Sequence, residues 1–199
     1  MPNNSRETSA SQLARDYGVS LNEFATAVID VIVDADPPRE SDAHAARRRE
    51  VCAAVSAAMV LALDASTLSV EERERLEPRI HDVLLPFWRR HCAEDAEGPD
   101  YITSRIAHYT ARRVNGSQVT SAVNIVQALL ESIDVPVQRR AALSERLVPA
   151  FAHRLVGDVF RINEVRSRHG IDLPTIASVC ALLQMALSCD PVRRALHID

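Results

Sequence analysis

Residues 41–65, SDAHAARRREVCAAVSAAMVLALDA, decide the fold that this sequence predicts. Serine is a favoured residue at the start of a helix, and neither Gly nor Pro interrupts the stretch that follows Ser41. Its larger apolar side chains and alanines recur at the 3.6-residue helical period, at Val51, Val55, Ala58, Met59 and Ala62. The small alanine side chains permit close packing of a neighbouring helix, either within the chain or across a dimer axis.

The sequence before this stretch predicts two short helices, 11–17 and 21–34, on either side of Gly18. Pro37 and Pro38 end the second helix, because proline lacks an amide proton and restricts the residue before it. Residues 1–10 are polar and predict a flexible tail. Residues 11–36 are interpreted as an N-terminal helical hairpin appended to the domain.

Helix signals continue from residue 66 to the end of the chain. Ser69 to Glu72 form a capping box, and the helix that it begins is kinked or split by Pro78 and Pro86. Further starts and stops fall at Asp100, Asn115-Gly116, Ser117, Val135-Pro136, Gly170, Asp172 and Asp190-Pro191, with a kink expected at Pro149. The sequence therefore predicts an all-α fold, a single bundle of about eight or nine helices over residues 11–199, several of them kinked by proline.

The composition favours a soluble, cytoplasmic protein. Apolar residues make up 47% of the 199, enough for one core, and no run is long enough for a membrane span. Four cysteines without a regular spacing predict buried free thiols: Cys52, Cys92, Cys180 and Cys189. All 23 basic residues are Arg. The absence of Lys fits a GC-rich coding bias, or selection against lysine modification in a protein delivered into a host cell.

Charge is divided unevenly along the chain. Residues 1–100 hold 11 Arg and 19 acidic residues, whereas residues 101–199 hold 12 Arg and 8 acidic residues. The two halves are expected to attract each other, within one fold or between subunits. This asymmetry, with the frequency of symmetric oligomers, predicts self-association.

One short segment resembles a known motif. Gln12-Leu13-Ala14-Arg15-Asp16-Tyr17-Gly18-Val19-Ser20, continuing to Phe24 and Ala27, resembles the helix-turn-helix of bacterial regulators, which implies a transcriptional regulator. The helix that would enter the major groove departs from that pattern, because residues 21–34 contain no Arg and carry Glu23, Asp30 and Asp34. Binding to DNA needs cations for the phosphates. We therefore expect no tight binding to nucleic acid.

Histidines raise the possibility of a haem or metal site. His81 and Trp88 would share one helix face with Leu85, and His153 would share another with Val156 and Phe160. Either histidine could ligate haem in an apolar pocket, as in globin-like sensors, although a partly buried histidine with a hydrogen-bond partner is the simpler interpretation. The metal-binding spacings HExxH and CxxC do not occur, so no metal site is predicted.

Arg105, His108 and Arg112 form the most concentrated candidate for an anion or partner site, because their spacing places them on one helix face. No catalytic residues are predicted, since the sequence has no nucleophile motif and no glycine-rich phosphate loop. The first expectation is a non-enzymatic interaction or regulatory module that binds a protein partner or itself, without cofactor. The alternatives are a globin-like or regulator-like ligand sensor, with haem as one candidate ligand, and the helix-turn-helix regulator.

Overall fold

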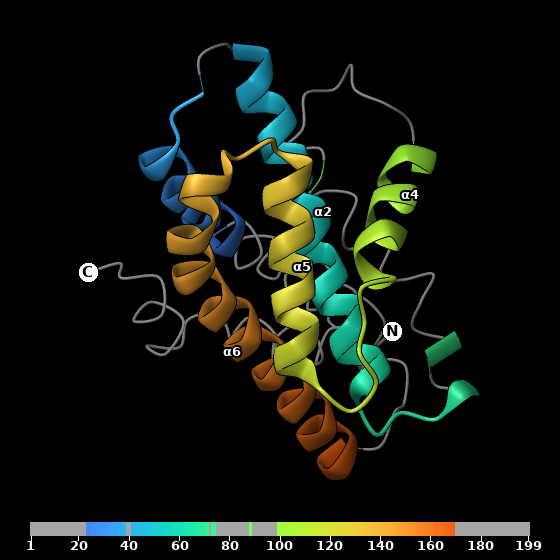
Figure 1. Ribbon diagram of the computed structural model, residues 1–199. Coiled ribbons are helices and arrows are strands. Elements are labelled where there is room, and N and C mark those ends of the chain that lie inside the picture. The colour runs from blue at the N-terminus through green and yellow to red at the C-terminus, as the bar shows by residue number, and fades with distance from the viewer. Residues whose placement is uncertain (1–22, 39–40, 72, 75–87, 89–98, 170–199) are drawn as a thin grey trace, which may run out of the picture.

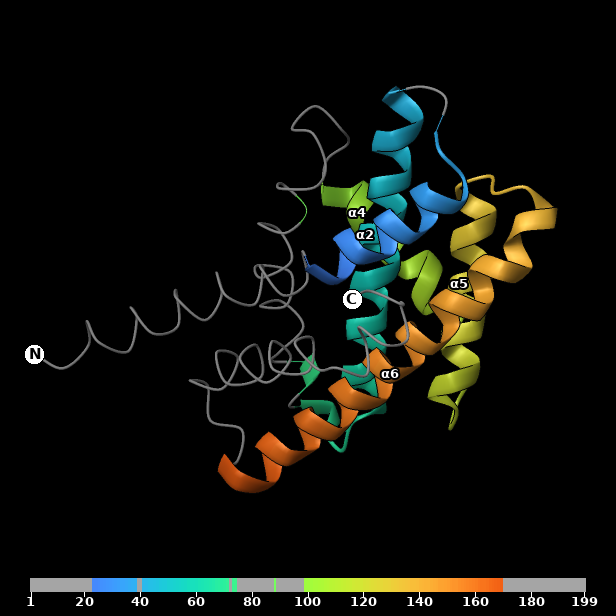
Figure 2. The same ribbon diagram turned by 90° about the vertical axis from the view of Figure 1, so that its left-hand side faces the viewer.

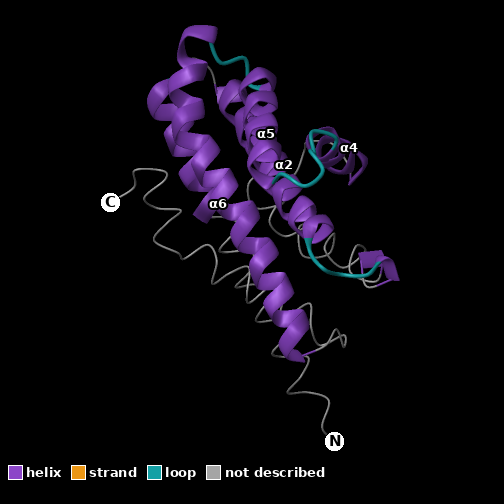
Figure 3. Ribbon diagram, turned by 60° about the horizontal axis from the view of Figure 1, so that its bottom comes forward, coloured by secondary structure: helices purple, strands orange, loops and turns teal. Residues whose placement is uncertain are grey.

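The computed structural model describes residues 23–38, 41–71, 73–74, 88 and 99–169. These residues are helical, with turns and loops between the helices and no strand among them (Figure 3). A first helix covers 23–35, and the others are α2 (Ser41–Ala65), α4 (Pro99–Thr110), α5 (Gln118–Ser132) and α6 (Val137–His169). The all-α prediction is confirmed for this part of the chain. The helices predicted at 11–17, between 75 and 87, and after 170 lie outside the described residues.

Helix α2 is the centre of the bundle and packs against α4, α5 and α6 (Figures 1 and 2). Every residue from 50 to 63 is buried except Val60, which is half-buried. Apolar and small residues therefore surround the axis on all sides, and a helix of that kind is stable only when neighbours cover it completely. The predicted packing of the alanine-rich face is confirmed, and the neighbours belong to the same chain.

Local signals explain most of the helix ends. Ser117 caps α5, because its hydroxyl accepts a hydrogen bond from the amide of Thr120 at 3.1 Å. Asp134 closes the other end with a positive φ of 54°, and the amide of Val135 donates to the carbonyl of Leu130. Helix α6 continues through Pro149 as one helix. Helix α4 differs from the prediction, because it ends at Thr110 rather than at Asn115-Gly116.

Ion pairs connect the two halves of the chain. Asp36 contacts Arg139 at 2.6 Å, Glu50 contacts Arg105 at 2.5 Å, and Asp64 contacts Arg113 at 3.2 Å. In each pair the acid comes from the acidic first half and the arginine from the basic second half. The attraction expected from the charge asymmetry therefore acts within one chain at these three places.

Two further sequence predictions concern the described residues. Cys52 is fully buried, as expected; the other three cysteines lie outside the described ranges. No helix in the described ranges combines the length and the apolar character that crossing a bilayer requires.

Ala58→Leu tests the close packing around α2. Ala58 is fully buried, so the larger side chain should overpack the core and lower the free energy of unfolding by about 1–3 kcal/mol. Ala107→Leu is the matched control, because Ala107 is exposed on α4. Urea unfolding followed by circular dichroism measures both variants. Equal stability of the two would contradict the central position of α2.

Candidate functional site

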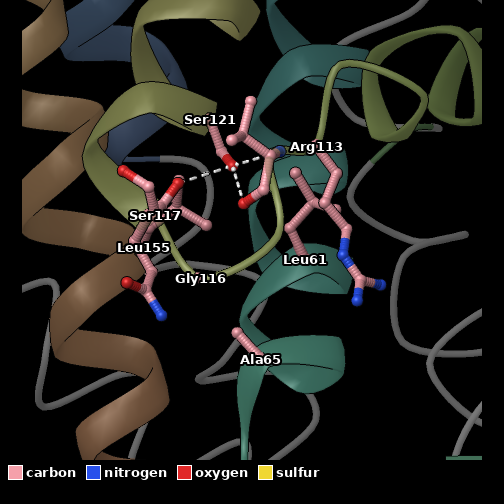
Figure 4. Close-up of a pocket in the computed structure, with 9 residues that line it drawn as sticks. Leu61, Ala65, Arg113, Gly116, Ser117, Ser121 and Leu155 are labelled. Carbon is pink, nitrogen blue, oxygen red and sulfur yellow. Dashed lines mark hydrogen bonds between the residues drawn. The ribbon is translucent and has the colours of Figure 1, made fainter.

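A pocket of about 130 Å³ opens where the last turns of α2 meet the start of α5 (Figure 4). Helix α2, the turn between α4 and α5, the first turn of α5, and α6 all contribute to it. Its lining residues are Leu61, Ala65, Arg113, Val114, Gly116, Ser117, Gln118, Ser121 and Leu155. Leu61 and Leu155 are buried and supply the apolar part, whereas the polar residues come from the turn and from α5.

Hydrogen bonds fix the wall of the pocket formed by the turn. The amide of Val114 donates to the hydroxyl of Ser121 at 2.9 Å, and that hydroxyl donates to the carbonyl of Ser117 at 2.9 Å (Figure 4). Gly116 has a φ of +80°, a conformation that L-residues with a side chain rarely adopt. Because the turn is held at several points, the pocket is formed before any ligand arrives.

The rim of the pocket combines apolar and cationic groups. Val114 lines the pocket and is 36% exposed; Val119 on α5 and Val156 on α6 are also exposed, at 56% and 49%, and each follows a lining residue in the sequence. Arg113 pairs with Asp64, but both side chains are about 40% exposed, and exposed pairs contribute little free energy. Arg113 can therefore exchange Asp64 for the carboxylate of a ligand at small cost.

A second polar cluster surrounds Glu50 on α2. The hydroxyl of Tyr109 donates to Glu50 Oε2 at 2.6 Å, and Arg105 Nη2 donates to the same oxygen at 2.5 Å. The hydroxyl of Tyr101 lies 3.4 Å from the other carboxylate oxygen, and Arg105 Nη2 also lies 3.3 Å from the hydroxyl of Ser132 on α5. Glu50 is 9% exposed, so this carboxylate joins α2 to α4 in a mostly water-free place.

The electrostatics of this cluster follow from its burial. Burial raises the pKa of Tyr109, and the hydrogen bond to Glu50 raises it further. For Arg105, burial opposes the charged form, but the contact with Glu50 outweighs it and the pKa is raised. Partial burial lowers the pKa of His108, with a further contribution from the charges of Arg105 and Arg112. Arg105 is therefore a charged partner of Glu50, and His108 favours its neutral form.

The predicted trio Arg105, His108 and Arg112 has divided roles. Arg105 points inward to Glu50, and its guanidinium is 5.6 Å from the ring centre of Tyr109. The ring of His108 meets Tyr109 edge-on at 5.1 Å. Arg112 is exposed in the turn after α4, where its carbonyl accepts a hydrogen bond from Asn124. The three residues are neighbours, but Arg105 already pairs with an anion of the protein itself, the carboxylate of Glu50.

The histidine candidates for haem are placed differently from one another. His81 lies outside the described residues. Trp88 is buried, and its indole nitrogen donates to the hydroxyl of Ser56 at 3.2 Å, which makes it part of the core. His153 is exposed on α6, and so lacks the apolar surroundings that a haem ligand needs. Within the described ranges, no three His, Cys, Asp or Glu side chains gather closely enough to hold a metal ion.

A buried ion pair on α6 was not singled out from the sequence. Arg154 Nε lies 3.0 Å from Asp158 Oδ2, and both side chains have no exposed surface. The guanidinium also lies 5.2 Å from the ring centre of Phe24. The spacing of four residues was a readable signal for the pair, but nothing in the sequence indicated its burial.

Comparisons with protein-family models, with curated proteins and with solved structures found no match for this chain. Evidence on function therefore comes from the chemistry of the sites.

Proposed function

We propose that this protein is a non-enzymatic helical binding module, and that the pocket at the start of α5 receives an apolar side chain of a protein partner. The preformed pocket, with the exposed Val114 and the cationic Arg113 in its wall, is the observation that carries this proposal. A cavity of about 150 Å³ holds a molecule of the size of benzene, so a pocket of about 130 Å³ suits one leucine or aromatic side chain. Energetically dominant residues of protein interfaces insert into small pockets of this kind.

The partner segment should carry an acidic residue beside its apolar one. Arg113 lies in the pocket wall, Arg112 is exposed next to it, and the N-terminus of α5 adds a partial positive charge. A carboxylate would therefore be attracted to this rim, while valines cover the neighbouring apolar surface. Catalysis would need several titratable groups converging on the pocket, but Arg113 is the single charged residue in its described lining.

Two variants are expected to weaken partner binding without damage to the core. Ala65→Phe fills the pocket from its exposed end, and Val119→Asp places a charge next in sequence to the lining residue Gln118. We expect each to weaken binding at least about tenfold, as loss of a central interface contact does. A partner is first captured with the parent protein from extracts of its own cells, and its affinity for each variant is then measured by calorimetry.

Val137→Asp is the matched control, because Val137, at 72%, is the most exposed large apolar residue of the described ranges. It begins α6, and the start of α6 lies at the opposite end of the bundle from the start of α5 (Figure 1). Equal weakening by Val137→Asp and Val119→Asp would refute the pocket as the binding site. A small-molecule adduct in native mass spectrometry that Ala65→Phe removes, without any protein partner, would favour the ligand sensor instead. The expectation that the chain does not bind DNA tightly stays a prediction.

A further inference from the structure

The contacts of helix 23–35 suggest a way for two copies of this chain to associate. Its apolar residues Phe24, Ala25, Val28, Ile29, Val31 and Ile32 are buried in the common core. Phe24 meets Phe151 of α6 edge-on at 5.4 Å, and the helix lies beside α2 and α6 (Figures 1 and 2). The helix therefore covers apolar residues of the bundle, Phe151 among them.

One feature under this helix favours its release. Arg154, beneath Phe24, is 1% exposed, and among the described residues its Nη1 and Nη2 have no hydrogen-bond partner. The ring of Phe24 replaces only part of the hydration that a guanidinium loses on burial. When the helix leaves, Arg154 loses the cover of Phe24 and water reaches its guanidinium. That hydration offsets part of the free energy lost by exposing the apolar side chains.

The connection to α2 adds a second feature. Helix 23–35 is followed by Asp36, Pro37 and Pro38, and α2 already begins at Ser41. Two consecutive prolines favour extended backbone, and only residues 36–40 join the two helices. Asp36 is held there by Arg47 and Arg139, each at 2.6 Å. Short connections under constraint favour the exchange of elements between copies.

We propose that helix 23–35 is an exchangeable element, and that the face of α6 around Phe151 and Arg154 accepts the same helix from a second copy of this chain. The partner is a second copy of this chain, because its helix 23–35 offers the same apolar residues that cover this face in the monomer. The open chain exposes six apolar residues of the helix as well as its vacant face, and both find their complement in another open chain. This association is independent of the pocket at α5.

The exchange has a thermodynamic signature that separates it from other kinds of dimer. The contacts between helix and face are identical in the closed monomer and in the exchanged dimer, so their strength cancels from the association constant. The strength of these contacts affects only the rate at which helix 23–35 leaves the closed monomer. The connection between helix 23–35 and α2 differs between the closed monomer and the exchanged dimer. Its length therefore changes the association constant.

The experiment combines light scattering of the full chain with two altered proteins. Insertion of Gly-Ser-Gly-Ser after Pro38 relaxes the closed monomer and should lower the association constant at least about tenfold. Arg154→Met combined with Asp158→Leu should leave the constant nearly unchanged. It should slow conversion between isolated monomer and dimer at least about tenfold, because opening no longer hydrates a buried ion pair.

Val119→Asp is the control that separates this proposal from the proposed function, because a dimer formed by exchange should persist in that variant. A chain that stays monomeric at millimolar concentration would overturn the exchange. A dimer whose constant is the same with and without the insertion would also overturn it. Circular dichroism of the insertion variant checks that it is folded, and the rate measured on the double variant tests the proposal without the insertion.

Discussion

Arg154→Met should be among the most destabilising single substitutions in this protein, with an expected loss of about 3–5 kcal/mol in the free energy of unfolding. Arg154 and Asp158 form a pair 3.0 Å apart without exposed surface, so removal of the cation leaves the carboxylate buried without it. The double variant Arg154→Met/Asp158→Leu should recover most of this loss, because replacing both charges by apolar groups of similar size is often neutral or stabilising. Urea unfolding of the parent, both single variants and the double variant gives the coupling energy.

The control for this prediction is the exposed pair of Arg113 and Asp64 on the surface. Arg113→Met should change the stability by less than about 1 kcal/mol, because solvent screens that pair. Additive effects of the two single substitutions at 154 and 158 would show that the charges do not depend on each other. That result would contradict the burial of the pair.

Glu50→Ala has the second largest expected effect, also a loss of about 3–5 kcal/mol. Glu50 Oε2 accepts hydrogen bonds from Tyr109 and Arg105, and its side chain fills space between α2 and α4. The substitution leaves a buried phenol hydroxyl and a partly buried guanidinium without their acceptor, and it opens a cavity. Glu50→Gln should recover part of the loss, because an amide oxygen can still accept from Tyr109.

Glu145→Ala provides the matched control, since Glu145 is exposed on α6. Its stability in urea should be that of the parent within about 0.5 kcal/mol. If Glu50→Ala is equally harmless, the cluster around Glu50 does not fasten α4 to α2.

The same cluster affects stability at alkaline pH. The pKa of Tyr109 is raised above its ordinary value of 10, first by burial and then by the hydrogen bond to Glu50. Above pH 10 the unfolded chain therefore releases a proton that the folded chain retains. The contribution of Tyr109 is fully present below pH 10, and it is lost as the pH rises from there towards the folded-state pKa.

The sequence was sufficient to predict the features that depend on residues close to one another along the chain. The bounds of α2 at Ser41 and Ala65, and the cap of α5 at Ser117, follow from capping residues and apolar periodicity, and the structure confirms both. The end of α4 was misplaced, because Arg112 and Arg113 are compatible with a helix. Their amides instead donate to carbonyls three residues earlier, as in a turn.

The sites depended on tertiary contacts that periodicity does not contain. Glu50 looks like any charged residue of a helix, and its role appears only when Tyr109 and Arg105 are placed against it from a segment more than 50 residues away. The pocket likewise joins Leu61, Gly116 and Leu155 from three distant segments. The sequence identified Arg105 and His108 as a cluster, but it could not show that a buried carboxylate already neutralises Arg105.

The central position of α2 matters during biosynthesis. The helix leaves the ribosome well before α4, α5 and α6, and α6 ends about 100 residues later, which corresponds to roughly 5–20 s of translation. Throughout that interval the apolar residues within 50–63 of α2 lack the cover that α4, α5 and α6 later provide. We therefore expect slow translation of residues 99–169 to increase the tendency of the nascent chain to aggregate.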